Sequence, residues 1–422
     1  MSERLKGDWM IIGIGNIGSN SLKTKIIDIN NENEVRVLGE ANVDKIKNRG
    51  RSNFTHSIGD KKATSKSVRI MGFEAGIKLI FNWYIKSGVV SSLKDIRAMG
   101  FNCVLGEKNG ASILTQKISD EMKRFTFIAS THNQQLIEAI GEFKRILNVP
   151  MVGIFESSFH YSLPEFRRLS GFPWNWYKKL GIKKNGCSSI SHQYLAAMAY
   201  KLERTEKMNL LTIYLGERSS ICAIRDGKSI DTSMSFSPDS GLLQRTGVGD
   251  IDGVALLFAM NELGLSAVDA LDEISNNAGL IATAGIETDD FQDILDAAKK
   301  GNKRADLAVN LYIDGIRKYI GALSTVLGNV DCIVFGGEIG EKSIYVREKC
   351  LENMDYMGIR LDLARNKELN GELGLISSDY SVVSKTKIYI VPTNVEMVVA
   401  YFTKKVIEKG KDLIPEDMIF RL

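Results

Sequence analysis

The first forty residues alternate between apolar and polar side chains in the way that paired strands do. An apolar run over residues 9–15 is followed by a short polar turn and then by residues 22–28, which begin by alternating. A period of two residues is typical of a strand with one buried face. We therefore predict a β-meander over residues 9–40, with a tight turn in residues 16–23. The polar and basic residues 41–68 predict a loop.

Apolar residues at helical spacing appear next. They predict helices over residues 73–87 and 132–147. Short apolar runs predict buried strands over residues 96–105 and 149–155, and residues 120–128 are mixed.

The second half repeats the opening arrangement. Residues 210–216 form an apolar run that ends in glycine, residues 217–220 are a small polar turn, and residues 221–225 are the returning strand. The arrangement recurs after roughly 200 residues, which indicates two similar domains rather than a solenoid. Residues 226–228 are a hairpin turn signal. The Ser-, Gly- and Asp-rich residues 231–252 predict a long functional loop.

The remainder predicts mostly helices, with two buried strands. The helices are expected over residues 253–263, 266–275 with Ser266 as N-cap, 290–300, 306–327, from 343 onward and 394–409; the strands are expected over residues 332–335 and 387–391. Such a duplicated unit looks like the superfold shared by actin, sugar kinases and heat-shock ATPases, in which ATP lies in a cleft between the halves.

Composition narrows the function classes. The chain has 422 residues, of which 44% are hydrophobic and 25% charged, and a net charge of +4. This argues for two globular domains and gives no nucleic-acid footprint. No apolar run reaches the length of a membrane span. The five cysteines are scattered without metal spacing, and their odd number and the absence of a hydrophobic targeting core fit a cytoplasmic protein.

Six segments in order resemble one family, the acetate kinases, which include propionate kinases and, more distantly, butyrate kinases. The family's Asn-Ala-Gly-Ser-Ser-Ser-Leu-Lys opening corresponds to residues 16–23, and its Gly-Lys-Ser-Val-Asp-Thr-Ser-Met-Gly-Phe-Thr-Pro segment to residues 227–238. Its other motifs correspond to residues 155–160, 248–253, 337–342 and 391–396. One such motif is weak, but six in order are specific.

The resemblance implies an α/β fold with two similar ribonuclease H-like domains and a nucleotide cleft between them. The N-terminal domain would comprise residues 1–150 and the C-terminal helix, about 394–422. The second domain would comprise residues 151–393, bind the nucleotide and form a homodimer. The long helix over residues 306–327 is a candidate for the dimer contact, although it also fits a core helix. Members of the family use ATP with Mg²⁺ to convert a short carboxylate into an acyl phosphate, and ADP is the other product.

The nucleotide side of the family pattern is largely kept. The resemblance assigns the nucleotide to Asn16, Ser19, Ser21 and Lys23 in the first phosphate loop, to Gly216 and Arg218 in the second, and to Asp290, Phe291, Gln292, Gly337, Glu338, Ile339 and Gly340 around the adenosine. It assigns Mg²⁺ to Asn16 and Glu396. The family usually has arginine at Gln292. Taken alone, Arg218 fits a solvated hairpin residue equally well.

The acceptor side departs from the family. Asn102 and Gly247 stand where the family has its two active-site arginines. Ser188 stands where the family has the transition-state histidine, and Glu156 replaces its catalytic aspartate. In the second phosphate turn, Glu217-Arg218 replaces the family's Asn-Gly. The candidate catalytic residues are therefore Glu156, His132, Arg245, Asn102 and Ser188. An arginine that stabilises a transferring phosphoryl group is worth about 10³ to 10⁵ in rate. Acetate kinase activity is therefore not expected unless Arg245 or Arg218 compensates.

Two main hypotheses follow. In the first, the protein is a kinase for another small molecule: Glu156 acts on a hydroxyl or binds Mg²⁺, and Asn102, Cys187 and Ser188 form a neutral pocket. An altered, larger carboxylate anchored by Arg245 is a variant. In the second, the protein is a nucleotide-binding pseudoenzyme with a regulatory or scaffold role. A structural role without nucleotide is a third.

Overall fold

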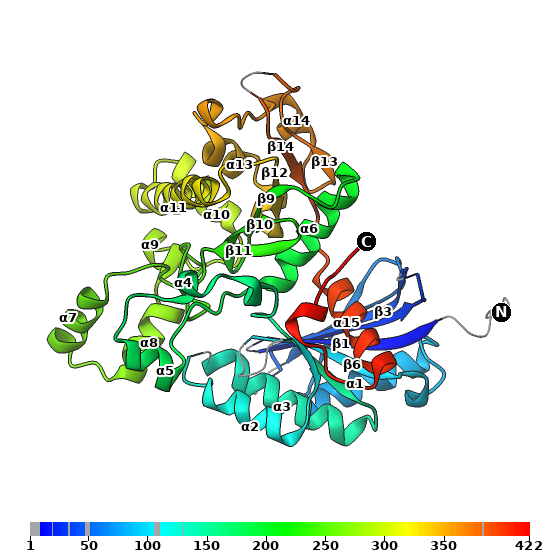
Figure 1. Cartoon of the computed structure of the whole chain (residues 1–422). Coiled ribbons are helices and arrows are strands. Elements are labelled where there is room, and N and C mark those ends of the chain that lie inside the picture. The colour runs from blue at the N-terminus through cyan, green and yellow to red at the C-terminus, as the bar shows by residue number, and fades with distance from the viewer. Residues whose placement is uncertain are drawn as a thin grey trace. The chain divides into compact units, whose positions relative to one another are not determined.

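The computed structural model describes residues 9–18, 20–32, 34–46, 51–104, 110–128, 130–381 and 384–422, with only the backbone for residues 130–132. The chain divides into two compact units (Figure 1). The first contains residues 1–158 with 394–420 and 422, and the second contains residues 159–393 with 421. Each unit is built on one sheet.

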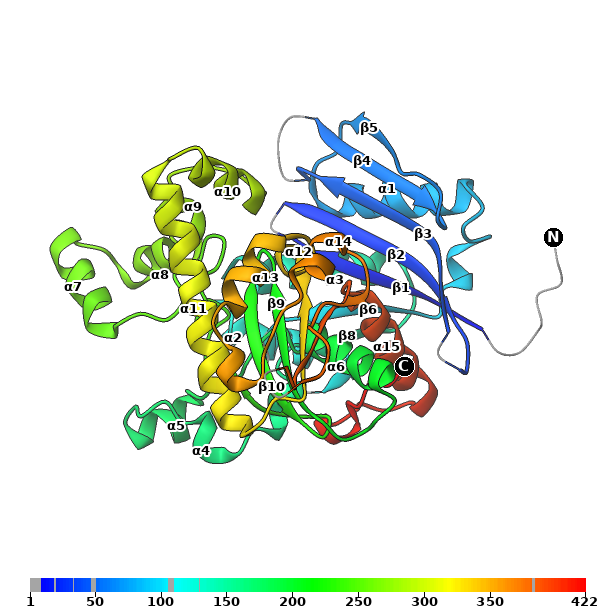
Figure 2. The same cartoon turned by 90° about the horizontal axis from the view of Figure 1, so that it is seen from above.

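The first unit holds an eight-stranded sheet in the order β5-β4-β3-β2-β1-β6-β8-β7 (Figure 2). The strands are β1 (Met10–Ile17), β2 (Ser21–Ile29), β3 (Val35–Asp44), β4 (Ser52–Ile58), β5 (Thr64–Val68), β6 (Ala98–Cys103), β7 (Ala111–Ile113) and β8 (Met151–Phe155). β1 to β5 form an antiparallel meander, whereas β6 pairs with β1 and β8 in parallel.

Helices cover both faces of this sheet. The helices are α1 (Gly72–Lys86), α2 (Gln116–Arg124), α3 (Ser130–Ile146) and α15 (Val395–Lys409), with short 3₁₀ turns at Leu93–Asp95 and Pro415–Asp417. Met99 and Phe101 of β6 are buried with α1 and α3. Gly100 points to the other face, where an added Cβ would lie 2.3 Å from Thr403 Oγ1 of α15. The glycine therefore allows α15 to approach the strand closely.

The predicted loop over residues 41–68 is wrong, because β3 continues to Asp44 and two further strands, β4 and β5, follow. Phe54 of β4 is buried, but most side chains of β4 and β5 are polar and partly exposed. Partly exposed strands of this kind, at or beside the edge of a sheet, lack the apolar alternation by which strands are recognised. The mixed residues 120–128 are likewise partly helical, since α2 ends at Arg124.

The second unit holds a six-stranded sheet in the order β11-β10-β9-β12-β14-β13. The strands are β9 (Asn209–Leu215), β10 (Ser219–Arg225), β11 (Lys228–Thr232), β12 (Cys332–Gly336), β13 (Gly374–Leu375) and β14 (Lys387–Ile390). β10 begins two residues before the predicted start, so the turn after β9 is shorter than expected. The predicted turn at residues 226–228 joins β10 to β11, and both Asp226 and Gly227 have positive φ there.

This sheet also lies between helices. Leu211, Ile213 and Leu215 of β9 pack with the long helix α11 (Lys303–Leu327). Thr212, on the opposite face, is hydrogen-bonded by His192 of α6 (Ser189–Glu203). The other helices are α4 (Glu165–Arg168), α5 (Trp174–Leu180), α7 (Gly253–Leu263), α8 (Ala267–Asn276), α9 (Gly279–Ala284), α10 (Phe291–Lys299), α12 (Gly337–Lys342), α13 (Ile344–Leu351) and α14 (Leu363–Glu368), with 3₁₀ turns at Phe159–Ser162 and Asp355–Met357.

The two sheets share one topology. In each, an antiparallel hairpin (β1–β2 or β9–β10) is extended by two parallel strands (β6 and β8, or β12 and β14). The predicted duplicated α/β fold is confirmed. Among the described residues, no single helix is long and apolar enough to cross a membrane; α7 and α8 pass that test only as a pair bent by 120°.

Candidate functional site

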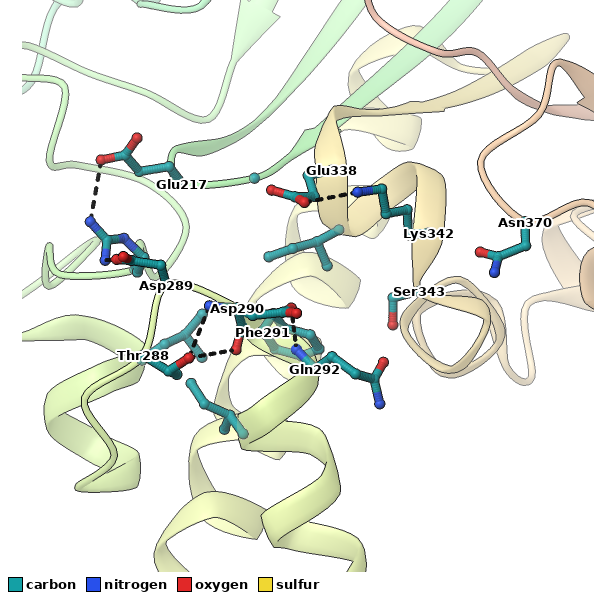
Figure 3. Close-up of a pocket in the computed structure, with 15 residues that line it drawn as sticks. Glu217, Thr288, Asp289, Asp290, Phe291, Gln292, Glu338, Lys342, Ser343 and Asn370 are labelled. Atoms are coloured by element: carbon teal, nitrogen blue, oxygen red, sulfur yellow. Dashed lines mark hydrogen bonds and ion pairs between the residues drawn. The ribbon is translucent and has the colours of Figure 1, made fainter. Parts of the chain in front are cut away.

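The second unit contains a pocket of about 430 Å³ at the end of β9 (Figure 3). The β9–β10 turn, the segment that leads into α10, and α12 form most of its wall. Its lining residues are Gly216, Glu217, Arg245, Leu280, Thr288, Asp289, Asp290, Phe291, Gln292, Ile294, Glu338, Ile339, Lys342, Ser343 and Asn370. Six residues that the sequence predicts for the nucleotide therefore line one cavity: Gly216, Asp290, Phe291, Gln292, Glu338 and Ile339.

Hydrogen bonds at the N-terminus of α10 fix the position of the pocket wall on this side. The carboxylate of Asp290 accepts a hydrogen bond from the Gln292 N–H at 2.9 Å, and the hydroxyl of Thr288 accepts one from the Asp290 N–H at 3.0 Å. The Gln292 side chain donates to Asp296 at 2.6 Å. Phe291 is thereby held at the first turn of the helix, where its ring contacts that of Tyr312.

A turn that contains Gly337 fixes the position of the pocket wall formed by α12. Gly337 has a φ of +77°, and an added Cβ would lie 2.4 Å from the Leu215 carbonyl oxygen, so the turn requires glycine. The Gly337 N–H donates to Glu341 Oε1 at 2.8 Å and to Thr393 Oγ1 at 2.9 Å. This turn carries Glu338 and Ile339 into the pocket. Gly337 and Gly340 do not line the cavity themselves.

Five of the six charged residues that line the pocket are paired with one another. Arg245 forms ion pairs with Glu217, at 3.5 Å, and with Asp289. Lys342 pairs with Glu338 at 2.9 Å. Arg245, one of the catalytic candidates predicted from the sequence, therefore lies in the wall of this pocket.

Arg218 is not a lining residue. Its guanidinium donates to the Pro238 carbonyl oxygen at 3.1 Å and pairs with Asp239 at 3.4 Å. The side chain is therefore engaged with the loop that follows β11.

The first unit carries the hairpin predicted to bind phosphate. Asn16 is exposed at the end of β1, and the Gly18 N–H donates to the Ser21 carbonyl oxygen at 3.0 Å, which closes the turn. Ser19 lies outside the described residues. Lys23 pairs with Glu40 at 2.9 Å. Burial alone lowers the pKa of Lys23, but Glu40 and other nearby carboxylates outweigh it and raise the pKa, which keeps this lysine charged.

The residues predicted to bind Mg²⁺ are Asn16, described above, and Glu396. Glu396, at the start of α15, pairs with Lys25 at 3.1 Å. Burial raises the pKa of Glu396, but Lys25 and Lys23 outweigh it and lower the pKa, so the carboxylate is ionised and already neutralised by lysine. The described part of the chain contains no cluster of three metal-binding side chains. The assignment of Asn16 and Glu396 to Mg²⁺ stays a prediction.

Two catalytic candidates meet in the first unit. The Asn102 side-chain amide, on β6, donates to Glu156 Oε1, just after β8. The Glu156 N–H donates to the Cys103 carbonyl oxygen at 2.9 Å, which fixes Glu156 beside the end of β6. Burial raises the pKa of the Cys103 thiol, and the charge of Glu156 raises it further. The oxygen of the Asn102 amide is buried and accepts no hydrogen bond.

The two remaining candidates are in other places. His132 belongs to α3, but its side chain lies outside the described residues. Ser188 is a buried residue of the second unit with a φ of +57°, directly before α6. The roles of these two residues and of the pocket residues stay predictions.

Several residues that line the pocket were not predicted from the sequence. Thr288, Asp289, Ser343 and Asn370 come from loops or helix starts, and Leu280 and Ile294 from helices. The available signal is adjacency to a motif: Asp289 directly precedes the Asp290-Phe291 segment, and Ser343 directly follows residues 337–342. Asn370 lies in an irregular segment that no motif marks.

Comparisons with known proteins agree on one family. The model of the Acetokinase family matches residues 10–401. The chain is 36% identical over 409 residues to an acetate kinase of Clostridium novyi (strain NT), covering 95% of this chain and 99% of that one. It superposes on the crystal structure of Porphyromonas gingivalis acetate kinase with a TM-score of 0.83 and 28% identity, covering 94% and 99% of the two chains. A propionate kinase from Francisella tularensis shares the fold, with a TM-score of 0.84, 24% identity and coverage of 93% and 98%.

Proposed function

The chain belongs to the acetokinase family of phosphotransferases, and on this premise we propose that it transfers a phosphoryl group from ATP to a hydroxyl compound and not to acetate. The observation that carries the proposal is the contact between Asn102 and Glu156. It puts a carboxylate and a neutral amide together at a position where the family has an arginine.

The pocket of the second unit suits the adenosine part of the nucleotide. Phe291, Ile294 and Ile339 give it apolar surface for a base, and Gln292, Ser343 and Asn370 give it hydrogen-bonding groups. Its volume, about 430 Å³, lies within the range of ordinary small-molecule sites, which is roughly 300 to 1,000 Å³. Members of the family use Mg²⁺ with the nucleotide. Mg²⁺ is commonly held by only one or two carboxylates together with substrate phosphates, so it would arrive with the ATP.

Electrostatics favour a neutral acceptor. A carboxylate substrate placed beside Glu156 would meet a like charge, and Asn102 offers no positive charge in compensation. Like charges at short range in a partly buried site oppose binding. A hydroxyl group instead provides the proton that a carboxylate accepts.

In the proposed reaction Glu156 is the general base. Its carboxylate takes the proton of the acceptor hydroxyl while the hydroxyl oxygen forms a bond to the γ-phosphorus. The bond between that phosphorus and the bridging oxygen breaks, and ADP leaves with the electron pair. Asn102, by donating to Oε1, holds the carboxylate in one orientation. General base catalysis of this kind contributes about 10² to 10⁴ in rate.

A second candidate function is nucleotide binding without transfer. It is favoured by the neutral residues Asn102, Gly247 and Ser188 at the positions of the family's arginines and histidine. In that case the pocket would serve a regulatory or scaffold role.

The test is ADP formation with a panel of acceptors that contains sugars, polyols and short carboxylates. We expect turnover with a hydroxyl acceptor and background rates with acetate. Glu156→Gln should lower kcat by about 10² to 10⁴ and leave the nucleotide Kd unchanged, because the residue acts on the acceptor. Glu74→Gln, which changes an exposed carboxylate of α1, is the control and should have no effect. Turnover of acetate at the rate of the best alcohol would contradict the proposal. Nucleotide binding without turnover on any acceptor would favour the second function.

We also propose that the protein is a homodimer. The support comes from α7, whose side chains are predominantly apolar although none of its residues is buried, and from exposed leucines near the start of α11. A partner helix would remove this apolar surface from water.

A further inference from the structure

Two arginines, Arg245 and Arg218, lie at or near the pocket, and the fold holds their side chains in different ways. Arg245 lines the cavity, whereas Arg218, in the neighbouring β9–β10 turn, does not. Both pair with carboxylates of the chain, so the character of each pair decides which arginine is available to a ligand.

The pair of Arg218 is part of the folded framework. Its partner Asp239 is only 12% exposed and also accepts a hydrogen bond from the Ser275 hydroxyl at 2.9 Å. Arg218 further donates to the Pro238 carbonyl oxygen. Release of Arg218 would leave a buried carboxylate and a carbonyl with fewer partners, which is costly.

The pairs of Arg245 are of the opposite kind. Asp289 is 97% exposed and Glu217 is 75% exposed, so both carboxylates are well solvated without the arginine. Ion pairs between exposed groups contribute little to stability. The Arg245 guanidinium is therefore held at the pocket by partners that it can exchange at little cost.

The backbone of Arg245 is fixed independently of its side chain. The Arg245 N–H donates to the Glu217 carbonyl oxygen at 3.3 Å, and the Arg245 carbonyl oxygen accepts from the Ile281 N–H at 3.1 Å. Exchange of the side chain's partners consequently needs only rotation of the side chain, and the pocket wall stays in place.

The second cation of the pocket lies elsewhere. Glu217 and Asp289 lie toward one side of the cavity, and Lys342 lies toward the other with Ser343 and Asn370 (Figure 3). Lys342 pairs with Glu338 one helical turn away. The remaining lining carboxylate, Asp290, caps α10. Among the described residues that line the cavity, the cation that an anionic ligand meets on the side of Glu217 is therefore Arg245.

We propose that Arg245 is an exchangeable anion-binding residue. Its guanidinium gives up its ion pairs with Asp289 and Glu217 and binds a phosphate group of the nucleotide instead. This proposal rests on the proposed nucleotide site and concerns the selectivity of that site. Glu217 and Asp289 compete with the ligand for the guanidinium, so the pocket favours nucleotides with a phosphate group over the bare nucleoside. A guanidinium matches phosphate oxygens with two parallel donors, whereas Glu217 lies at 3.5 Å and Asp289 accepts from one guanidinium nitrogen only.

The experiment measures the Kd of ADP and of adenosine by calorimetry at fixed Mg²⁺ and ionic strength. Arg245→Ala should weaken ADP binding by about tenfold or more and change adenosine binding less than about twofold, because one charge-assisted phosphate contact is lost. Asp289→Asn should tighten ADP binding by about two- to fivefold, because a weakly bound competitor is removed. In the Arg245→Ala background Asp289→Asn should lose that effect. Asp379→Asn is the matched control, since Asp379 is an exposed partner of Arg365 outside the pocket.

The outcomes separate this inference from the proposed function. Equal weakening of ADP and adenosine by Arg245→Ala would mean that the arginine merely shapes the pocket, and would overturn the inference. Weaker ADP binding in Asp289→Asn would also overturn it, because Asp289 would then be positioning Arg245. In both cases the nucleotide site would stand. Failure of the unchanged protein to bind either ligand would overturn the nucleotide site and the inference together.

Discussion

His160 and His192 are fully buried imidazoles of the second unit, and each makes hydrogen bonds through both ring nitrogens. His160 Nε2 donates to the Cys187 carbonyl oxygen at 3.1 Å, so Nδ1 accepts from the Ser229 hydroxyl at 2.8 Å. His192 contacts two hydroxyls at 2.7 and 2.8 Å. Burial lowers the pKa of His160 to about 4 and lowers that of His192 well below its ordinary value. Both rings are neutral at pH 7.

These rings predict a loss of stability in mild acid. In the unfolded chain a histidine takes up a proton near pH 6.5, whereas folded His160 does so only near pH 4. The contribution of neutral His160 to the free energy of unfolding is therefore fully present above pH 6.5, and it is lost as the pH drops toward 4. The shift of His160 alone should remove about 3 kcal/mol of unfolding free energy over that range. Urea unfolding at a series of pH values measures the effect.

The matched variants are His160→Gln and His56→Gln. His160→Gln should be less stable at pH 7 but should lose less stability between pH 6.5 and pH 4. His56 lies on β4 of the other sheet, beside the edge strand β5, and is only partly buried, so His56→Gln should leave most of the pH dependence intact. An unchanged slope in His160→Gln would contradict this account.

At the scale of elements, one buried arginine joins the helices behind the pocket of the second unit. Arg347 of α13 is completely buried and has no carboxylate partner among its hydrogen bonds. It donates to the Asn366 side chain at 2.7 Å and to carbonyl oxygens at the ends of α12 and α14, including those of Gly340 and Leu369. Burial lowers its pKa to about 10, which still leaves it charged at pH 7. The carbonyl groups at helix C-termini favour such a cation.

Arg347→Met should therefore destabilise the protein by roughly 3 to 5 kcal/mol, because several buried acceptors lose their donor together. It should also weaken nucleotide binding, since α12 and the segment around Asn370 form one wall of the pocket. Thermal unfolding and ADP titration measure the two effects. Arg360→Met is the control: Arg360 pairs with Asp355 at the surface, and its loss should change stability by less than about 0.5 kcal/mol. Equal effects of the two variants would contradict the role of Arg347.

At the scale of the whole molecule, the exposed apolar side chains of α7 and α11 concern the oligomeric state. Val254, Leu257 and Phe258 of α7, and Leu307 and Leu311 of α11, are all exposed in the single chain. A helix that is apolar yet exposed is typical of a surface that is covered in an assembly.

We expect the protein to elute as a dimer in size-exclusion chromatography with light scattering. The double variant Leu257→Lys, Phe258→Glu should elute as a monomer with the circular dichroism of the unchanged protein, because the contact is lost and the fold is not. Leu363→Glu, at an exposed position on α14, should leave the dimer intact. A dimer that persists in the double variant would exclude α7 as the contact.

The sequence by itself determined the family and the duplicated fold. Buried strands such as β9 and β12 are recognised by their continuous apolar runs, and the helix α8 is recognised by its N-cap, Ser266. These signals are local, and the motif order adds a long-range pattern. The edge strand β5 and its neighbour β4 were not predicted, because partly exposed strands carry little apolar periodicity.

Only the tertiary structure decided how the candidate residues are grouped. It brought Asn102 and Glu156 into contact across 54 positions of sequence, and it placed Arg245 beside Asp289 in the pocket wall. Charge pairing depends on which turns converge at the ends of strands, and residue spacing along the chain does not specify this. The same physical reason explains why Arg245 and Arg218 look alike in the sequence yet differ in the structure: the exposure of their carboxylate partners is a property of the folded surroundings.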